Sequence, residues 1–179
     1  MTRLNIVEEF PKTAVPVWVK RLEENERIEV LFLGQKWLKI MIHWNGMWKP
    51  KGRTEACTKP TSECPWHAQN MPLRGKAYMH VYNLTVKDEQ FLELPPGGLE
   101  DLERYFRKPD SYRGIQAFVK RGRGKKARVS CETGYFVPSS QQGPMPVELS
   151  PWISLAPLYR MRVSEVEIVD HEDFSLLAS

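Results

Sequence analysis

The 179-residue chain has few of the features that mark secreted or membrane proteins. Only three residues are cysteine, an odd number that does not suggest a secreted disulfide framework. No apolar run approaches the roughly 18 residues of a membrane span, and the N-terminus lacks the apolar stretch of a signal peptide. These absences predict a soluble protein in a reducing cytoplasm.

Several enzyme signatures are missing as well. The sequence has no HExxH pair, no carboxylates clustered beside His43 or His80 and no glycine-rich phosphate loop. We therefore expect a protein that is not an enzyme. A zinc-dependent nuclease that uses His43 or His80 is the competing hypothesis.

The net charge of +4 is unevenly distributed along the chain. From Val137 onward there are two basic and six acidic residues, a net charge of −4, so the first 136 residues carry +8. A basic body followed by an acidic tail indicates a polyanionic partner such as nucleic acid. The hydrophobic and charged contents, 41% and 27%, are ordinary for a globular domain with appendages.

Two cysteines and two histidines fall within one short stretch. His43, Cys57, Cys64 and His67 have the spacing H-x13-C-x6-C-x2-H. Zinc prefers four tetrahedral thiolate and imidazole ligands, often with one closely spaced pair, and a closed set of four leaves no site for catalysis. The stretch predicts a structural Zn2+ site. The alternative is that both cysteines are ordinary loop thiols and that His43 merely ends a strand.

The apolar pattern predicts a mainly β protein. Apolar residues at every second position indicate strands, whereas Leu99, Leu102 and Phe106 have the spacing of a short helix within Leu99–Lys108. Such a set suggests an OB-like barrel with an inserted zinc-binding loop, and a helix that plugs one end. The expected strands are Arg27–Gly34, Lys36–Trp44, Gly75–Thr85, Gln90–Leu94, Ile115–Arg121 and Lys125–Cys131.

Aromatic and basic residues gather on two of these strands. Tyr78, His80 and Tyr82 would share one face of their strand, where tyrosines either stack nucleic-acid bases or lie in a core beneath a second layer. Between Arg107 and Arg128 nine residues are basic and one is acidic, and Phe118 would share the charged face. This hairpin either contacts nucleic acid or is simply a solvated charged surface. We expect Cys131 to be a small core residue.

The two ends of the chain are less informative. Residues 1–27 read as an arm that includes an edge strand at Pro16–Arg21 or a loosely ordered lead-in. The acidic end would contact partner proteins, occupy the basic surface when nucleic acid is absent, or fray. The expected divisions are an N-terminal arm (1–27), an OB-like domain (28–136) with a zinc insertion (43–67), a proline-rich linker or covering loop (137–157), and a final strand with an acidic tail (158–179).

These motifs together resemble the phage single-stranded DNA-binding proteins, the family of the helix-destabilising protein of T-even bacteriophages. That family inserts a zinc-binding subdomain, with ligands in the order His, Cys, Cys, Cys, into an OB fold. Here His67 stands where the third cysteine is expected, and CPWH is followed by the tyrosine-bearing AYMHVYN. The resemblance covers roughly residues 28–135. The second gap differs, and no clear match to an N-terminal cooperativity arm is present.

The residues and the resemblance imply sequence-tolerant binding of single-stranded DNA in replication or recombination, in the cytoplasm of a bacterial or phage-infected cell. Replication or recombination proteins are expected partners of the acidic tail, and self-association on DNA is expected. An alternative is a zinc-stabilised module that binds protein or RNA, and stacking and phosphate contacts do not separate DNA from RNA. Expected base-stacking residues are Trp48, Trp66, Tyr78, Tyr82 and Phe118, and expected phosphate-binding residues are Lys51, Arg53, Arg74, Lys76, Lys120, Arg121, Arg123, Lys126 and Arg128.

Overall fold

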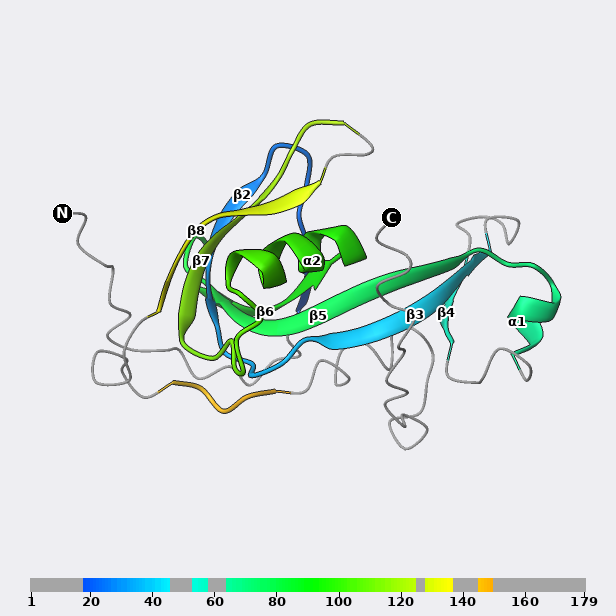
Figure 1. The fold of residues 1–179 in the computed structure, drawn as a ribbon, viewed down its shortest axis with the longest axis horizontal. Helices are drawn as coiled ribbons and strands as arrows, with labels where there is room; N and C mark the ends of the chain where they lie inside the picture. Colours follow the sequence, from blue (N-terminus) through cyan, green and yellow to red (C-terminus); the bar gives the residue numbers. More distant parts are fainter. Residues whose placement is uncertain (1–17, 46–52, 58–63, 125–127, 137–144, 150–179) are drawn as a thin grey trace.

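Eight strands and two helices make up the described part of the protein (Figure 1). The structure is a computed structural model that describes residues 18–45, 53–57, 64–124, 128–136 and 145–149. The strands are β1 (Trp18–Arg21), β2 (Arg27–Phe32), β3 (Leu38–Asn45), β4 (Arg53–Ala56), β5 (Leu73–Asn83), β6 (Asp88–Leu94), β7 (Ile115–Arg121) and β8 (Val129–Phe136). The helices are α1 (Pro65–Ala68) and α2 (Pro96–Tyr105). The prediction of a mainly β protein is confirmed.

The strands form one sheet in the order β1-β6-β5-β2-β7-β8, and β3 pairs with both β5 and β4. β1 runs parallel to β6, whereas the other pairs are antiparallel. Within the described residues β1 and β8 do not pair with each other. The described strands therefore form an open sheet that curls around α2 (Figure 1), and the expected closed barrel is not observed.

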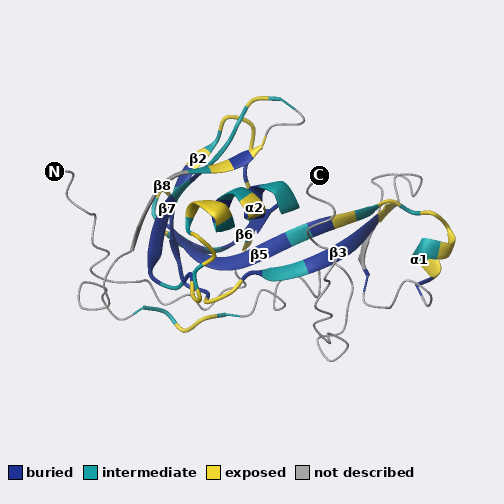
Figure 2. Ribbon diagram, viewed as in Figure 1, coloured by how far each residue is buried: buried dark blue, intermediate teal, exposed yellow. Residues whose placement is uncertain are grey.

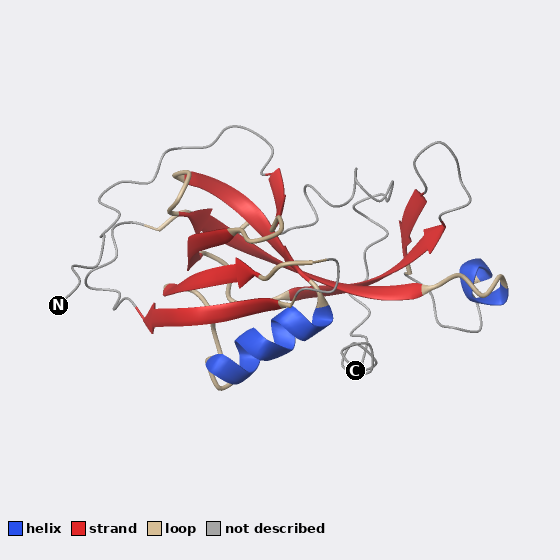
Figure 3. Ribbon diagram, turned by 90° about the horizontal axis from the view of Figure 1, so that it is seen from above, coloured by secondary structure: helices blue, strands red, loops and turns tan. Residues whose placement is uncertain are grey.

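Strand alternation places the main apolar core on one face of the sheet. Phe32, Met79 and Val119 are at most 1% exposed and belong to the main core. Leu99 and Leu102 of α2 pack into the same core, so the helix lies across this face (Figures 2 and 3). The predicted helix is confirmed, but it begins at Pro96 rather than Leu99. Proline suits the first helical turn, where its missing N–H has no partner to lose.

The opposite face of the sheet is also covered, and this overturns one prediction. Tyr78 and Tyr82 are 0% and 4% exposed. Tyr78 packs with Ile40 and Ile42, and Tyr82 packs with Leu31 and with neighbouring apolar side chains. Neither ring offers a face to a base. The stacking prediction for both tyrosines is therefore wrong, and the core alternative describes them.

Residues 145–149 supply part of this cover. Arg113 donates hydrogen bonds to the carbonyl oxygens of Leu33 and Pro146, the latter at 2.7 Å. The backbone N–H of Gln35 donates to Oε1 of Glu148 at 2.9 Å, and Met145 packs near Tyr82. These five residues therefore cover part of this face, and the linker-or-covering-loop assignment of 137–157 stays a prediction. The expected strand Leu158–Val169 and the acidic tail lie outside the described residues.

His80 of β5 is hydrogen-bonded to the covering segment 145–149. Its ring is 1% exposed, with Nε2 3.0 Å from Oε2 of Glu89, while Nδ1 accepts a hydrogen bond from the backbone N–H of Leu149 at 3.2 Å. Nδ1 can accept only when it carries no proton. Burial lowers the pKa of His80, and the negative charges of Glu89 and Glu148 oppose this shift in part. Burial and the hydrogen bond to Nδ1 both favour the neutral form of the ring.

This arrangement predicts a pH dependence of stability. The unfolded chain protonates His80 near its ordinary pKa of 6.5, whereas the folded protein resists protonation, so the free energy of unfolding should fall as pH drops below about 6.5. We expect His80→Gln to reduce this slope between pH 7 and pH 5, measured by urea unfolding at each pH. An unchanged slope in the variant would contradict the assignment.

Candidate metal centre and nucleic-acid interface

Three segments bring the predicted metal ligands together. His43 lies near the end of β3, and Cys57 follows β4, where its N–H donates to the carbonyl oxygen of Met41 at 2.7 Å. Cys64 caps the N-terminus of α1, and His67 lies within that helix. One ligand atom from each of the four residues lies within 4.8 Å of the others. The predicted grouping of the four residues is confirmed.

The spacing of the ligand atoms fits a single ion. The Cys57 and Cys64 sulfurs are 3.8 Å apart, and Cys64 Sγ is 3.4 Å from Nε2 of His43. Tetrahedral sites with bonds of about 2.0–2.3 Å have ligand–ligand distances of roughly 3.3–3.8 Å. Both cysteines are 5% exposed and belong to the main core. They are therefore not thiols of an exposed loop.

The histidine nitrogens also suit a metal centre. His43 Nδ1 lies 3.3 Å from the carbonyl oxygen of Met71. This contact can fix the ring orientation and the tautomer that leaves Nε2 facing the cysteines. Nδ1 of His67 is buried and has no hydrogen-bond partner within the described part of the chain. A buried polar atom without a partner is costly, and a cation bound through Nδ1 would satisfy it.

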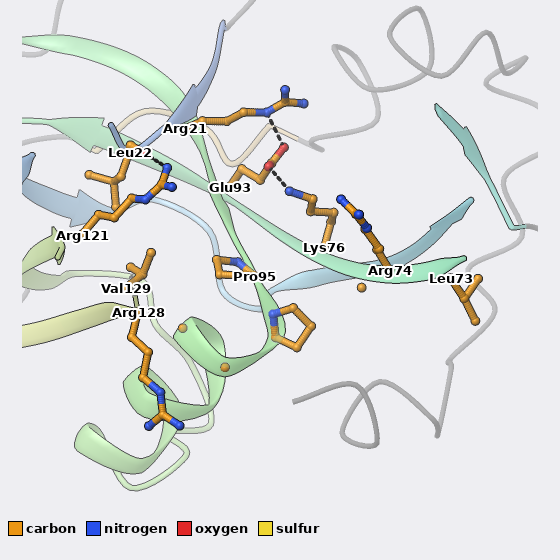
Figure 4. Close-up of a pocket in the computed structure, with 14 residues that line it drawn as sticks. Arg21, Leu22, Leu73, Arg74, Lys76, Glu93, Pro95, Arg121, Arg128 and Val129 are labelled. Carbon is orange, nitrogen blue, oxygen red and sulfur yellow. Dashed lines mark hydrogen bonds and ion pairs between the residues drawn. The ribbon is translucent and has the colours of Figure 1, made fainter. Parts of the chain in front are cut away.

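A basic groove lies beside the N-terminus of α2 (Figure 4). Its volume is about 640 Å3. β1, β5, β6, β7 and β8 contribute to its walls, and the first residues of α2 border it, where the helix dipole favours an anion. Five cationic side chains and one carboxylate, Glu93, are among its lining residues. The five are Arg21, Arg74, Lys76, Arg121 and Arg128.

Glu93 organises two of these cations. It is 5% exposed and accepts hydrogen bonds from Nε of Arg21 at 2.8 Å, from Nζ of Lys76 at 2.5 Å and from the Tyr78 hydroxyl at 2.9 Å. Burial raises the pKa of Glu93, but Lys76, Arg21 and Tyr78 outweigh it and hold this pKa below its ordinary value. The lining residues include five cations and one carboxylate, so the lining carries a net positive charge.

The groove contains only part of the predicted nucleic-acid site. Arg74, Lys76, Arg121 and Arg128 were predicted and line it, whereas Arg21 was not predicted. Its position in a short edge strand gave no signal in the sequence, because its groove neighbours come from distant parts of the chain. Trp44 was missed as well. It is 40% exposed, and the Arg74 guanidinium lies 5.3 Å from its ring centroid.

The other predicted residues are elsewhere or undescribed. Phe118 is half-buried under the guanidinium of Arg27, 3.9 Å from the ring centroid. Trp66 is half-buried against the main core. Lys120 and Arg123 do not line the groove, and Arg53 is described only as a residue of β4. The remaining three, Trp48, Lys51 and Lys126, lie outside the described residues.

Comparison of the chain with protein-family models, curated proteins and solved structures finds no match. In the described residues, no helix has the length and apolar character needed to cross a membrane.

The cluster predicts selective loss of metal on substitution. We expect Cys57→Ser and Cys64→Ser to reduce the metal content well below about one ion per chain and to lower the unfolding temperature, because each change removes a thiolate ligand. Inductively coupled plasma mass spectrometry and thermal unfolding are the measurements. Cys131→Ser is the matched control, since Cys131 packs against the main core outside the cluster. Equal metal content in all three variants would contradict the assignment.

Proposed function

We propose that the protein binds single-stranded DNA without strong sequence preference, as a non-enzymatic component of replication or recombination. The observation that carries the proposal is the groove, which is lined by one carboxylate and by five cations that come from β1, β5, β7 and the residue before β8. Cations drawn together from distant parts of a chain repel one another unless an anion compensates them. A nucleic-acid backbone is such an anion, and it extends along a groove.

The metal in this proposal is structural zinc. Cys2His2 is a ligand set that zinc favours, and four protein ligands leave no open position for a substrate or a catalytic water. The ion would hold β4 and α1 against the outer ends of β3 and β5. Because β5 also carries Arg74 and Lys76, the metal would fix one wall of the groove.

The resemblance to phage single-stranded DNA-binding proteins belongs to the same proposal. The curled sheet with α2 against its concave side is the feature that supports an OB-like relationship, although the described strands leave the sheet open. A phage origin, association along DNA and contact of the acidic end with replication or recombination proteins follow from the resemblance and the charge pattern. These three points are part of the same proposal.

Salt titration tests the proposed function. Each phosphate contact with a single strand contributes about −0.7 to the slope of log affinity against log salt. We expect binding of labelled oligo-dT to weaken steeply with salt when it is followed by fluorescence anisotropy. Oligo-rU of the same length measures the preference for DNA over RNA. No binding, or a flat response to salt, would contradict the proposal. Cleavage of the strands with added metal would favour the nuclease alternative.

A single groove cation gives a sharper prediction. Arg128→Ala should weaken oligo-dT binding at low salt and reduce the magnitude of the salt slope by about 0.7, because one phosphate contact is lost. Arg104→Ala is the matched control, since Arg104 is an exposed arginine near the end of α2 that pairs with Glu100 and does not line the groove. Equal effects of the two substitutions would indicate a general charge effect rather than a defined groove.

A further inference from the structure

Trp44 is a large apolar side chain that the fold leaves open to solvent. Its exposed fraction is 40%, whereas Ile42, two residues earlier on the same strand face, is 4% exposed. Alternation along β3 sends Trp44 to the face opposite the metal ligand His43. Trp44 is therefore adjacent to a predicted ligand in sequence but on the other face of β3, and it is not part of the ligand set.

The backbone that carries Trp44 is hydrogen-bonded on both sides. β3 pairs with β4 on one side, where Trp44 is opposite Thr54. On the other side the N–H of Trp44 donates to the carbonyl oxygen of Pro72 at 3.3 Å. Hydrogen bonding on both edges restricts the motion of the strand. A ligand that stacks on a ring carried by such a strand orders little additional backbone.

Trp44 is also in line with the groove. Arg74 is opposite Ile42 and Lys76 is opposite Ile40, so both cations share the face of Trp44. Successive side chains on one face of a strand are about 7 Å apart, a step comparable with that between neighbouring phosphates of an extended single strand. Arg74 contacts the indole and lines the groove. Trp44, Arg74 and Lys76 therefore lie in sequence along one face of the sheet.

We propose that Trp44 forms the subsite for an unpaired nucleobase at the outer end of the groove, with Arg74 positioned for the adjoining phosphate. This proposal rests on the proposed function and adds the residue that selects single strands. Every base has a π-face, so stacking on an indole tolerates any sequence. A base inside a duplex is already stacked and paired, so it does not offer that face.

Strands with and without bases separate stacking from phosphate binding. The probes are fluorescently labelled oligo-dT and an abasic strand of the same length, whose phosphates are unchanged. The variants are Trp44→Ala and Trp44→Phe, and the matched control is Trp18→Ala, which removes another exposed tryptophan, 69% exposed, outside the groove. Metal content and thermal unfolding are measured for each variant.

We expect wild type to bind oligo-dT about tenfold or more tighter than the abasic strand. Trp44→Ala should remove most of this difference while abasic binding stays unchanged, Trp44→Phe should keep a larger part of it, and Trp18→Ala should match wild type. Ultraviolet cross-linking of wild type to an oligonucleotide containing 5-iodouracil, read by mass spectrometry, should modify Trp44. This second measurement does not depend on the folding of a variant.

The outcomes distinguish the two levels of the proposal. An oligo-dT preference in Trp44→Ala equal to that of wild type would overturn the base subsite and leave the proposed function standing. Equal weakening toward both strands would also overturn it, since the indole would then act only through the fold. Absence of binding to either strand by wild type would overturn the proposed function itself.

Discussion

The antiparallel pairing of β3 with β5 is the constraint on which both the metal centre and the groove depend. Its register places Leu38 opposite Tyr78 at one end and His43 opposite Leu73 at the other. A slip by one residue would exchange the two faces of a strand. A slip of β3 would turn His43 away from the cysteines, and a slip of β5 would turn Arg74 and Lys76 away from the groove. The buried Ile40, Ile42 and Tyr78 oppose such a slip, because it would expose apolar surface.

Glu93 is a buried carboxylate that links the core of the sheet to the cations of the groove. A buried carboxylate is costly unless it is paired and hydrogen-bonded, and here two cations and a tyrosine hydroxyl satisfy it. The contacts that offset the cost of burying Glu93 also restrain the side chains of Arg21 and Lys76. Tyr78 thus contributes to the site through Glu93 from inside the sheet rather than as a stacking platform.

Spacing and alternation predicted the metal cluster, the main strands and the helix, because these depend on local periodicity and on ligand type. Alternation gave the shared face of Tyr78 and Tyr82 correctly, but it does not tell whether a second layer covers that face. Residues 145–149 supply part of that layer from far along the sequence. For Trp44 the error is the reverse. Its place on the aliphatic face of β3 predicts a buried side chain, but it lies at the end of the strand and is exposed.

The nearness of the metal ligands to the groove implies a mechanical connection between them. Met71 accepts from His43, Pro72 accepts from the N–H of Trp44, and Arg74 follows two residues later. The four residues from Met71 to Arg74 therefore contact both the ligand set and the proposed base subsite. An ion that fixes His43 would limit the motion of this segment and hence of the Arg74 guanidinium. In this arrangement the metal would contribute geometry to binding, while the attraction for the strand would come from the groove cations.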